Sequence, residues 1–507
     1  MRPIRGTTVP AHGEAAAPRV IGGPPGAHGW WPLAVIASAH LMAVLDTTVM
    51  FVALPSAQRA LGLSVTTRQW VLTAYTLALA GLLLLGGRLA DRLGARRTLL
   101  IGVAGFALAS AVGGASVDGA MLIGSRAVQG AFAAVLVSST KSLLITVYAG
   151  EADRARAIGI FTATLTAGLA VGLVLGGVLT SELGWRWCLY VNVAVSLAVL
   201  IGARRVLPAV PGRREVRLDV TSVVLASAGM AALVYGLGEA SSAGWGSGQV
   251  TGSLIASAAL LAGFAAHQAG RPNPLLPLRV IYDRNRGGAL IALICNSLST
   301  FGIMLILTYQ IQSVMHYSPL RTGLALVPFA VAAATSAAVI APRLLARVRP
   351  RWPVIAGIVL SAAGLLPLAG LTPGSRYLPL IFVATTIEGL GTGLAGPAAL
   401  AAALRGVLPA DTGAAAALSS TAGQFGSSIG AALLNTVATT AAAGYLAAHP
   451  GASTATGTVH GYAVAMAWGA ALLVVAVIPI GILVNARAPV TRPGARYPTA
   501  AAPRRAG

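Results

Sequence analysis

Charged residues and cysteines are scarce in this sequence. Only 9% of its 507 residues are charged, whereas 56% are hydrophobic, a proportion that no soluble core of this size requires. The two cysteines, Cys188 and Cys295, fall within or at the end of long apolar stretches, which excludes a disulfide framework. The sequence also contains no metal-ligand cluster, nucleotide-binding loop or nucleophile constellation, so we expect no enzyme, no metal, no cofactor and no direct use of ATP.

Acidic residues are the scarcer of the two charged classes. Thirteen Asp and Glu stand against 35 Lys and Arg, which gives a formal net charge of +22. On a soluble protein this excess would indicate nucleic acid as a partner. Here the basic residues lie in short loops between apolar stretches, which is the pattern of cytoplasmic loops in membrane proteins. We therefore expect a lipid bilayer as the partner, and no nucleic acid.

Long apolar stretches are what the sequence has in abundance. A helix needs about 20 apolar residues to cross the hydrocarbon, and fourteen stretches approach that length: 31–53, 69–87, 98–115, 120–146, 157–180, 188–203, 220–238, 250–267, 287–311, 320–342, 353–371, 377–403, 412–440 and 463–485. With both termini inside, 28 basic residues fall on the inner side and five on the outer side. This asymmetry predicts a multi-pass protein of the plasma (cytoplasmic) membrane with both termini cytoplasmic.

The sequence contains a distant internal repeat. Residues 86–102 and 341–357 share Arg, Leu and Gly positions at a constant offset of 255, for example Arg88 with Arg343 and Gly102 with Gly357. The same offset carries the start of the first predicted span to the start of the ninth. Duplicated membrane halves of this kind are typical of secondary transporters, whose substrate site lies where the halves meet.

The repeat predicts the domain organisation. The seventh and eighth spans fall between the two halves as an insertion, after a linker that contains Pro208 and Pro211. We expect a disordered cytoplasmic tail at each end of the chain, two bundles of six helices, and a linker with two inserted spans between them. The boundaries are 1–29, 30–207, 208–269, 270–486 and 487–507.

Four motifs in the first half carry chemistry. The loop after the second span contains Gly87, Asp91, Arg92, Gly94 and Arg96, a set in which the glycines favour a tight turn and the charges suit an anionic leaflet, so the loop can latch one conformation. The first span contains a motif that begins at Leu45-Asp46 and ends at Pro55. The fourth span contains Arg126, Gln129 and Gly130. The fifth span has glycines whose spacing allows close helix contact, namely Gly159, Gly168, Gly172, Gly176 and Gly177.

These motifs resemble those of the major facilitator superfamily, in particular its fourteen-span drug/proton antiporter branch. The resemblance covers nearly the whole chain outside the tails. It implies an all-α integral membrane fold of two six-helix bundles plus two inserted helices, with alternating access between the bundles. The chain departs from the family pattern at Phe51, Ser138 and Leu173, where the family usually has Asn, Pro and Pro. Leu173 leaves open whether antiport itself is altered.

Ionisable residues inside the predicted spans are costly and are functional by default. At 1.5 Å per residue, Asp46 lies roughly 22 Å from the inner end of its span and Arg126 roughly 9 Å below the outer face, so their depths coincide and we expect a pair. Lys141 is expected to reach the inner headgroups. Glu388, near the middle of its span, is a candidate for proton binding or for attracting a cationic substrate; the alternative is a tolerated, protonated glutamate.

The sequence thus favours a proton-driven exporter of small amphipathic or cationic compounds, such as drugs and antibiotics, working as a monomer. Asp46 and Glu388 would couple protons to transport, and Arg126 would tune Asp46. Two alternatives stay open. One is a proton-coupled metabolite symporter, and the other is a membrane sensor that keeps the fold without transport.

Overall fold

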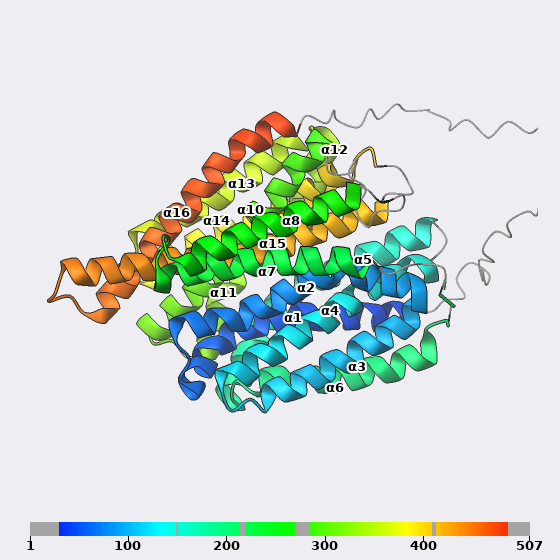
Figure 1. The fold of residues 1–507 in the computed structure, drawn as a ribbon, viewed down its shortest axis with the longest axis horizontal. Coiled ribbons are helices and arrows are strands. Elements are labelled where there is room, and N and C mark those ends of the chain that lie inside the picture. Colours follow the sequence, from blue (N-terminus) through cyan, green and yellow to red (C-terminus); the bar gives the residue numbers. More distant parts are fainter. Residues whose placement is uncertain are drawn as a thin grey trace, which may run out of the picture.

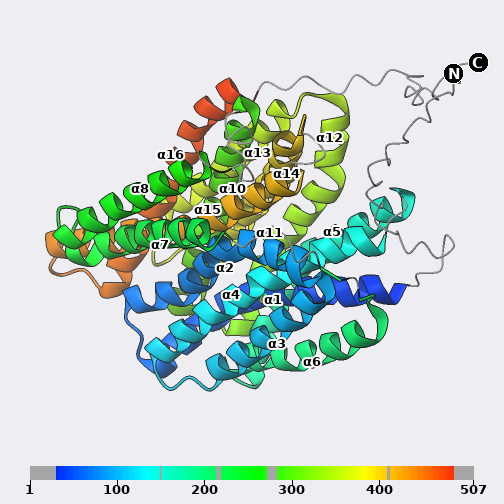
Figure 2. The ribbon, with the colours of Figure 1, turned by 45° about the vertical axis from the view of Figure 1, so that its right-hand side comes forward.

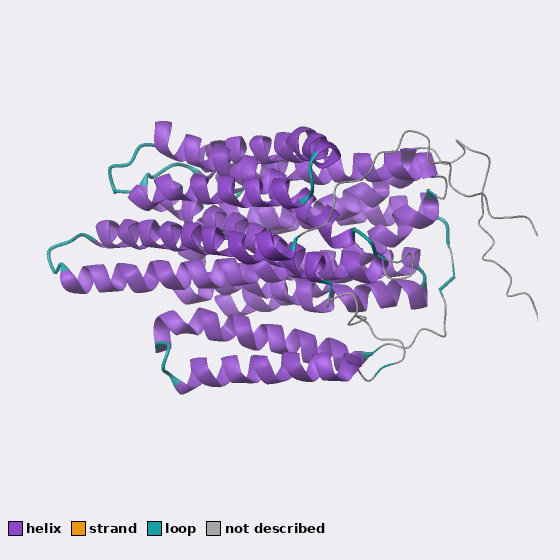
Figure 3. Ribbon diagram, turned by 90° about the horizontal axis from the view of Figure 1, so that it is seen from above, coloured by secondary structure: helices purple, strands orange, loops and turns teal. Residues whose placement is uncertain are grey.

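The described part of the protein is helical throughout, with the helices running roughly along one long direction (Figure 1, Figure 3). The computed structural model describes residues 30–148, 151–209, 211–212, 219–269, 271, 283–407 and 412–484. The tails expected over 1–29 and 487–507 lie outside these residues, as do most of the two linkers that flank the inserted spans.

Within the described residues, fourteen helices or joined helical segments follow one another. The first half contains α1 (Trp30–Leu61), α2 (Val65–Leu93), α3 (Ala95–Gly114), α4 (Gly119–Val147), α5 (Glu151–Glu182) and α6 (Trp187–Val206). The inserted pair is α7 (Val220–Ala243) and α8 (Gly248–Ala269). The second half contains α10 (Arg284–Tyr309) with η1 (Gln310–Val314), α11 (Pro319–Thr335) with η2 (Ser336–Ile340) and α12 (Ala341–Arg347), α13 (Arg351–Leu365) with η3 (Leu366–Gly370), η4 (Tyr377–Ile381) with α14 (Phe382–Leu404), α15 (Thr412–Ala448) and α16 (Thr454–Leu483).

The apolar length of these passes agrees with a membrane-spanning protein. Within the described ranges, twelve helices are long and apolar enough to cross a membrane, and a thirteenth is obtained if the bent α2 counts as one span. In α5 the apolar segment Gly168–Glu182 is shorter than these spans and is not counted among them. The predicted all-helical membrane fold is confirmed, and fourteen spans are compatible with it.

Short polar turns set where the helices begin. The side chains of Ser64, Asp118 and Ser318 each accept a hydrogen bond from a backbone N–H in the first turn of the helix that follows. Such caps satisfy backbone donors that no helical carbonyl can reach. Because these turns are short, consecutive helices are antiparallel. We call the end of the bundle where α1 begins at Trp30 the near end, and the end where α1 finishes at Leu61 the far end.

The two halves lie side by side, and the inserted pair lies against both of them (Figure 1, Figure 2). α7 packs on α2 of the first half and on α15 of the second, whereas α8 packs mainly on α7. Asp219 ties the pair together at the near end: it caps α7, and its carboxylate lies 3.4 Å from His267 and 3.7 Å from Arg271.

The buried apolar residues show how the halves meet. One cluster joins both halves and lies toward the far end; it includes Val49–Leu54 of α1 and Ile303–Leu307 of α10. Two further clusters lie toward the near end, and each belongs to one half alone. Among the described residues, the halves therefore share an apolar core at the far end and have separate cores at the near end. We call the contact surface between the halves the seam.

Candidate functional site: a buried ion pair beside the seam

The centre of the first half holds an ion pair. Arg126 Nη1 of α4 donates to Asp46 Oδ2 of α1 at 2.6 Å, and both side chains are completely shielded from solvent. The pairing expected from the two depths is confirmed. A buried ion pair is stable only if further hydrogen bonds satisfy its remaining atoms, because desolvation of both charges is expensive.

Two amides supply those hydrogen bonds on the carboxylate side. Gln129 Nε2 and Asn192 Nδ2 donate to Asp46 Oδ1 at 2.8 and 2.7 Å. Gln129 also accepts from Arg126 Nη1 and donates to Ser110 Oγ at 2.8 Å. The network thus joins α1, α3, α4 and α6. No roles were predicted from the sequence for Asn192 and Ser110. In the sequence, each is simply a polar residue inside an apolar span.

The guanidinium of Arg126 has its own support. Its Nε donates to the carbonyl of Val71 at 3.2 Å, and its central carbon lies 4.3 Å from the centre of the Tyr75 ring. A cation over an aromatic face is stabilised by the ring quadrupole. Arg126 Nη2, however, is buried without a hydrogen-bond partner. The site is therefore well connected around Asp46 and incomplete at one nitrogen of Arg126.

The glycines of α5 allow two close helix contacts. A Cβ at Gly168, Gly172 or Gly176 would collide with Leu41, Thr48 and Val49 of α1 respectively. Gly177 instead faces the other half, where a Cβ would lie 2.8 Å from the Cα of Leu320. A Cβ at Gly323 of α11 would in turn meet the carbonyl of Leu173.

These contacts place α5 between α1, which carries Asp46, and the seam. The glycines of α5 therefore allow close packing on α1 and on α11. The surroundings of Gly159 lie outside the described residues.

The predicted latch between α2 and α3 has a turn formed by one glycine and not by two. Gly94 makes the turn between α2 and α3 with φ of 90°, whereas Gly87 lies inside α2 with open space around it. The expectation that both glycines form the turn was wrong, because α2 continues to Leu93. Asp91 and Arg92 are exposed, and Arg96 donates to the carbonyl of Arg204 at the end of α6.

Glu388 lies in the second half, fully buried in α14. Its Oε1 accepts from Ser299 of α10 at 2.9 Å and from Thr392 at 3.0 Å, and its Oε2 has no partner. The nearby Gly389 and Gly393 face the backbone of α11, and Gly391 faces α13. The glycines therefore permit close helix packing around Glu388.

Several hydrogen bonds between described residues cross the seam, and sequence reasoning missed them. Thr76 and Ser428 hydroxyls are 2.7 Å apart, and Asn435 Nδ2 donates to Gln69 Oε1 at 2.8 Å. Lys141 Nζ donates to Ser420 Oγ at 3.0 Å. Lys141 was expected to reach the inner headgroups, but its side chain turns toward α15 of the other half. A single sequence contains no sign of which helices will face each other across the seam.

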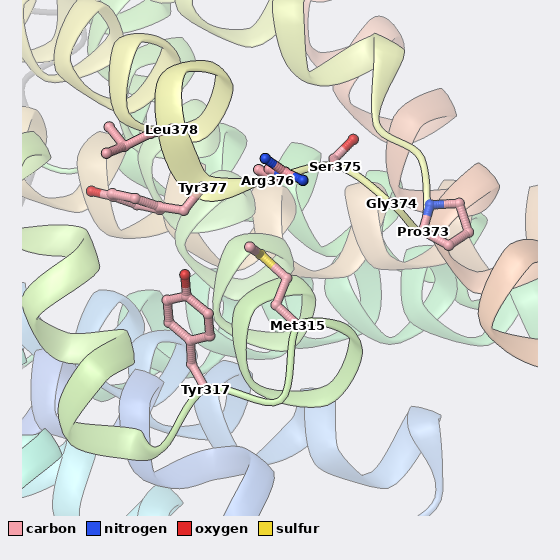
Figure 4. Close-up of a pocket in the computed structure, with 8 residues that line it drawn as sticks. All are labelled: Met315, Tyr317, Pro373, Gly374, Ser375, Arg376, Tyr377 and Leu378. Carbon is pink, nitrogen blue, oxygen red and sulfur yellow. The ribbon is translucent and has the colours of Figure 1, made fainter.

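A cavity of about 550 Å³ lies at the far end of the second half, away from the ion pair. Met315 and Tyr317 approach it from the turn after η1, opposite the segment 373–378 (Figure 4). Within the described ranges, no group of three or more His, Cys, Asp or Glu could hold a metal ion. Among the described residues, the ion pair and the seam are thus the two features that bear on function.

A family model described as Major Facilitator Superfamily matches residues 36–431, a range that contains Asp46, Arg126 and Glu388. The chain belongs to the Major Facilitator Superfamily. It is 43% identical over 462 residues to the puromycin resistance protein pur8 of Streptomyces alboniger, covering 90% of this chain and 92% of that protein. It is 39% identical over 409 residues to the cephamycin export protein CmcT of Amycolatopsis lactamdurans, covering 80% and 84%.

Solved structures of other transporters have a similar fold. The nucleoside transporter NupG aligns with a TM-score of 0.64 at 12% identity, covering 89% of this chain and 99% of that one. A bacterial homologue of the lysosomal transporter Spinster, in an inward-facing and occupied conformation, aligns with a TM-score of 0.63 at 14% identity, covering 91% and 97%. The resemblance inferred from the motifs is confirmed: this superfamily member is a multi-pass membrane transporter, similar to antibiotic resistance and export proteins.

Proposed function

We propose that this protein exports small amphipathic or cationic compounds, antibiotics among them, in exchange for protons. The observation that carries the proposal is the buried Asp46 carboxylate, which accepts hydrogen bonds from Arg126, Gln129 and Asn192. A titratable group at membrane depth, held on several helices, is the kind of group that couples a proton to a conformational change. The similarity to a puromycin resistance protein and a cephamycin export protein supports antibiotics as the substrate class.

Protonation of Asp46 would act on α1, which packs against α5 and reaches the seam at its far end. A neutral Asp46 no longer attracts Arg126, so the network that joins α1 to α4 and α6 weakens. Three residues further along α1, Val49 packs against Gly176 of α5, and Val49–Leu54 belong to the apolar cluster shared by both halves. A shift of α1 therefore changes the packing at the far end of the seam, which is what alternating access requires.

Orientation and organisation belong to the same proposal. The distribution of basic residues places the near end, with both termini, on the cytoplasmic side of the plasma membrane. The far-end cluster then closes the outer side. We propose two bundles, 30–207 and 270–486, separated by the linker and inserted pair of 208–269, with the transporter working as a monomer and with the 1–29 and 487–507 tails inside.

Inside-out vesicles with an imposed pH gradient test the proposal. We expect uptake of puromycin or a cephamycin when the vesicle interior is acidic, and loss of that uptake when the gradient is collapsed. Vesicles without the protein are the control. Uptake only in right-side-out vesicles would support the metabolite symporter, and binding without any uptake in either orientation would support the sensor.

A further inference from the structure

Two cations cross the seam without a carboxylate partner. Lys141 lies toward the near end and Arg68 toward the far end, and the three ion pairs found among the described residues include neither. Both extend from the first half to neutral groups of the second half. A cation held at membrane depth by neutral partners alone is costly, so an anion that reaches it between the halves is favoured as a counter-ion.

Lys141 is the single lysine of the sequence. Its ammonium donates to Ser420 Oγ of α15 at 3.0 Å, and its side chain is half-buried. Since α4 ends at Val147, Lys141 lies about 9 Å from the near end at 1.5 Å per residue. The two halves have separate apolar cores at this depth. Lys141 is therefore a cation at the part of the seam where the halves are least tightly joined.

Arg68 is 8% exposed and lies in the first turns of α2. Its guanidinium donates to Gln58 Oε1 at 3.3 Å and to Asn435 Oδ1 at 3.4 Å, and its central carbon lies 3.8 Å from the centre of the Tyr309 ring. Its Nε is buried without a partner. All of these contacts are with neutral groups, and two of the three are long for charge-assisted hydrogen bonds.

The buried carboxylates do not offset these two cations. Asp46 is neutralised by Arg126 within the first half. Glu388 is 0% exposed and is bonded to Ser299 and Thr392. Neither buried carboxylate is therefore a partner of these two cations, one of which lies toward each end of the route that a substrate would take between the halves.

We propose that the transported compounds are preferentially amphipathic molecules with a carboxylate, which Lys141 binds at the near end and Arg68 meets toward the far end. This inference rests on the proposed export function and selects among its substrates: amphipathic anions are favoured over lipophilic cations. A carboxylate forms charge-assisted hydrogen bonds with an ammonium and with a guanidinium, whereas a cation is repelled by both.

Two probes that differ only in the charge of one carboxylate, an acid and its methyl ester, test the inference beside two cationic probes. Purified protein in proteoliposomes with an acidic interior is given a cephalosporin free acid, its methyl ester, puromycin and tetraphenylphosphonium. We expect faster uptake of the acid than of the ester. Lys141→Met should lower uptake of the acid by about tenfold, the loss of one charge-assisted hydrogen bond, and leave the ester unchanged.

Matched variants separate the charge from the fold. Lys141→Arg keeps the cation and should retain the preference for the acid, and so should Ser420→Ala, which removes only the neutral partner. Arg186→Gln removes a cation that bonds to Ser116 within the first half and should leave the ratio of acid to ester unchanged. Size-exclusion chromatography checks that each variant is folded, and Lys141→Gln replaces Lys141→Met if the latter is not.

Two results would overturn the inference: equal uptake of acid and ester by the wild-type protein, or an equal loss of both in Lys141→Met. If no probe is taken up, puromycin included, the export function itself fails. Calorimetric binding of the acid and of the ester to the purified wild type and to Lys141→Met then decides the carboxylate site independently of transport.

Discussion

The guanidinium of Arg126 and the carboxylate of Asp46 are 80 residues apart in the sequence and 2.6 Å apart in the fold, and both are completely buried. Replacing one partner of such a pair leaves the other charge unpaired in a low-dielectric interior, which typically costs about 3–5 kcal/mol. Protonation of Asp46 would therefore leave Arg126 as an unpaired buried charge, so a change at Asp46 must disturb Arg126.

Asp46→Asn is expected to abolish proton-driven transport. The amide keeps the shape of the side chain and removes the group that titrates. Gradient-driven uptake in vesicles measures the effect, and Asn192→Ala, which removes a hydrogen bond to Asp46 and keeps the carboxylate, is the control that should retain part of the uptake. Unchanged uptake in Asp46→Asn would exclude Asp46 as a coupling residue.

Gly94→Val and Asp91→Asn are expected to slow turnover more than they weaken substrate binding. The loop lies at the near end, away from the ion pair, and Gly94 has φ of 90°, which a β-branched residue tolerates poorly. Gly87→Ala is the matched control, because that glycine lies within α2 with open space around it. Turnover and binding are measured on the same preparations; weaker binding at an intact turnover rate would contradict the latch.

Gly323→Ala is expected to shift the protein toward a conformation open at the far end. The added methyl group would meet the carbonyl of Leu173 across the seam, at the contact between α5 and α11. Labelling of a cysteine introduced at Leu320 should become faster. Gly124→Ala, where nothing lies close, should leave the labelling rate unchanged. Equal rates in both variants would mean that this contact does not hold the far end closed.

Glu388→Gln is expected to weaken transport of every substrate to a similar degree. The carboxyl group is fully buried and bonded to hydroxyls, so it is better placed to hold a proton than to touch a substrate. Uptake of a cationic, a neutral and an anionic probe measures this. A selective loss of cation transport would instead make Glu388 a determinant of charge preference, and no loss at all would make it a tolerated glutamate.

Much of the fold was predictable because hydrophobic length and loop charge are local properties of a sequence. The predicted span 120–146 became α4 (Gly119–Val147), and 377–403 became η4 with α14, over Tyr377–Leu404. The approach of Asp46 to Arg126 was also predictable, since a fixed rise per residue converts position in a span into depth. Depth restricts which charges can meet even when the neighbours of each helix are unknown.

The sequence alone thus determined the membrane fold, the repeat and the pairing of Asp46 with Arg126. Only the tertiary structure decided which face each helix turns to its neighbours. Asn192 joins Asp46 because α6 packs beside α1, and Lys141 meets Ser420 because its long side chain extends from α4 to α15. In apolar helices nearly every face is hydrophobic, so no periodic pattern marks the buried side, and the direction of a polar side chain is fixed only when the helices pack together.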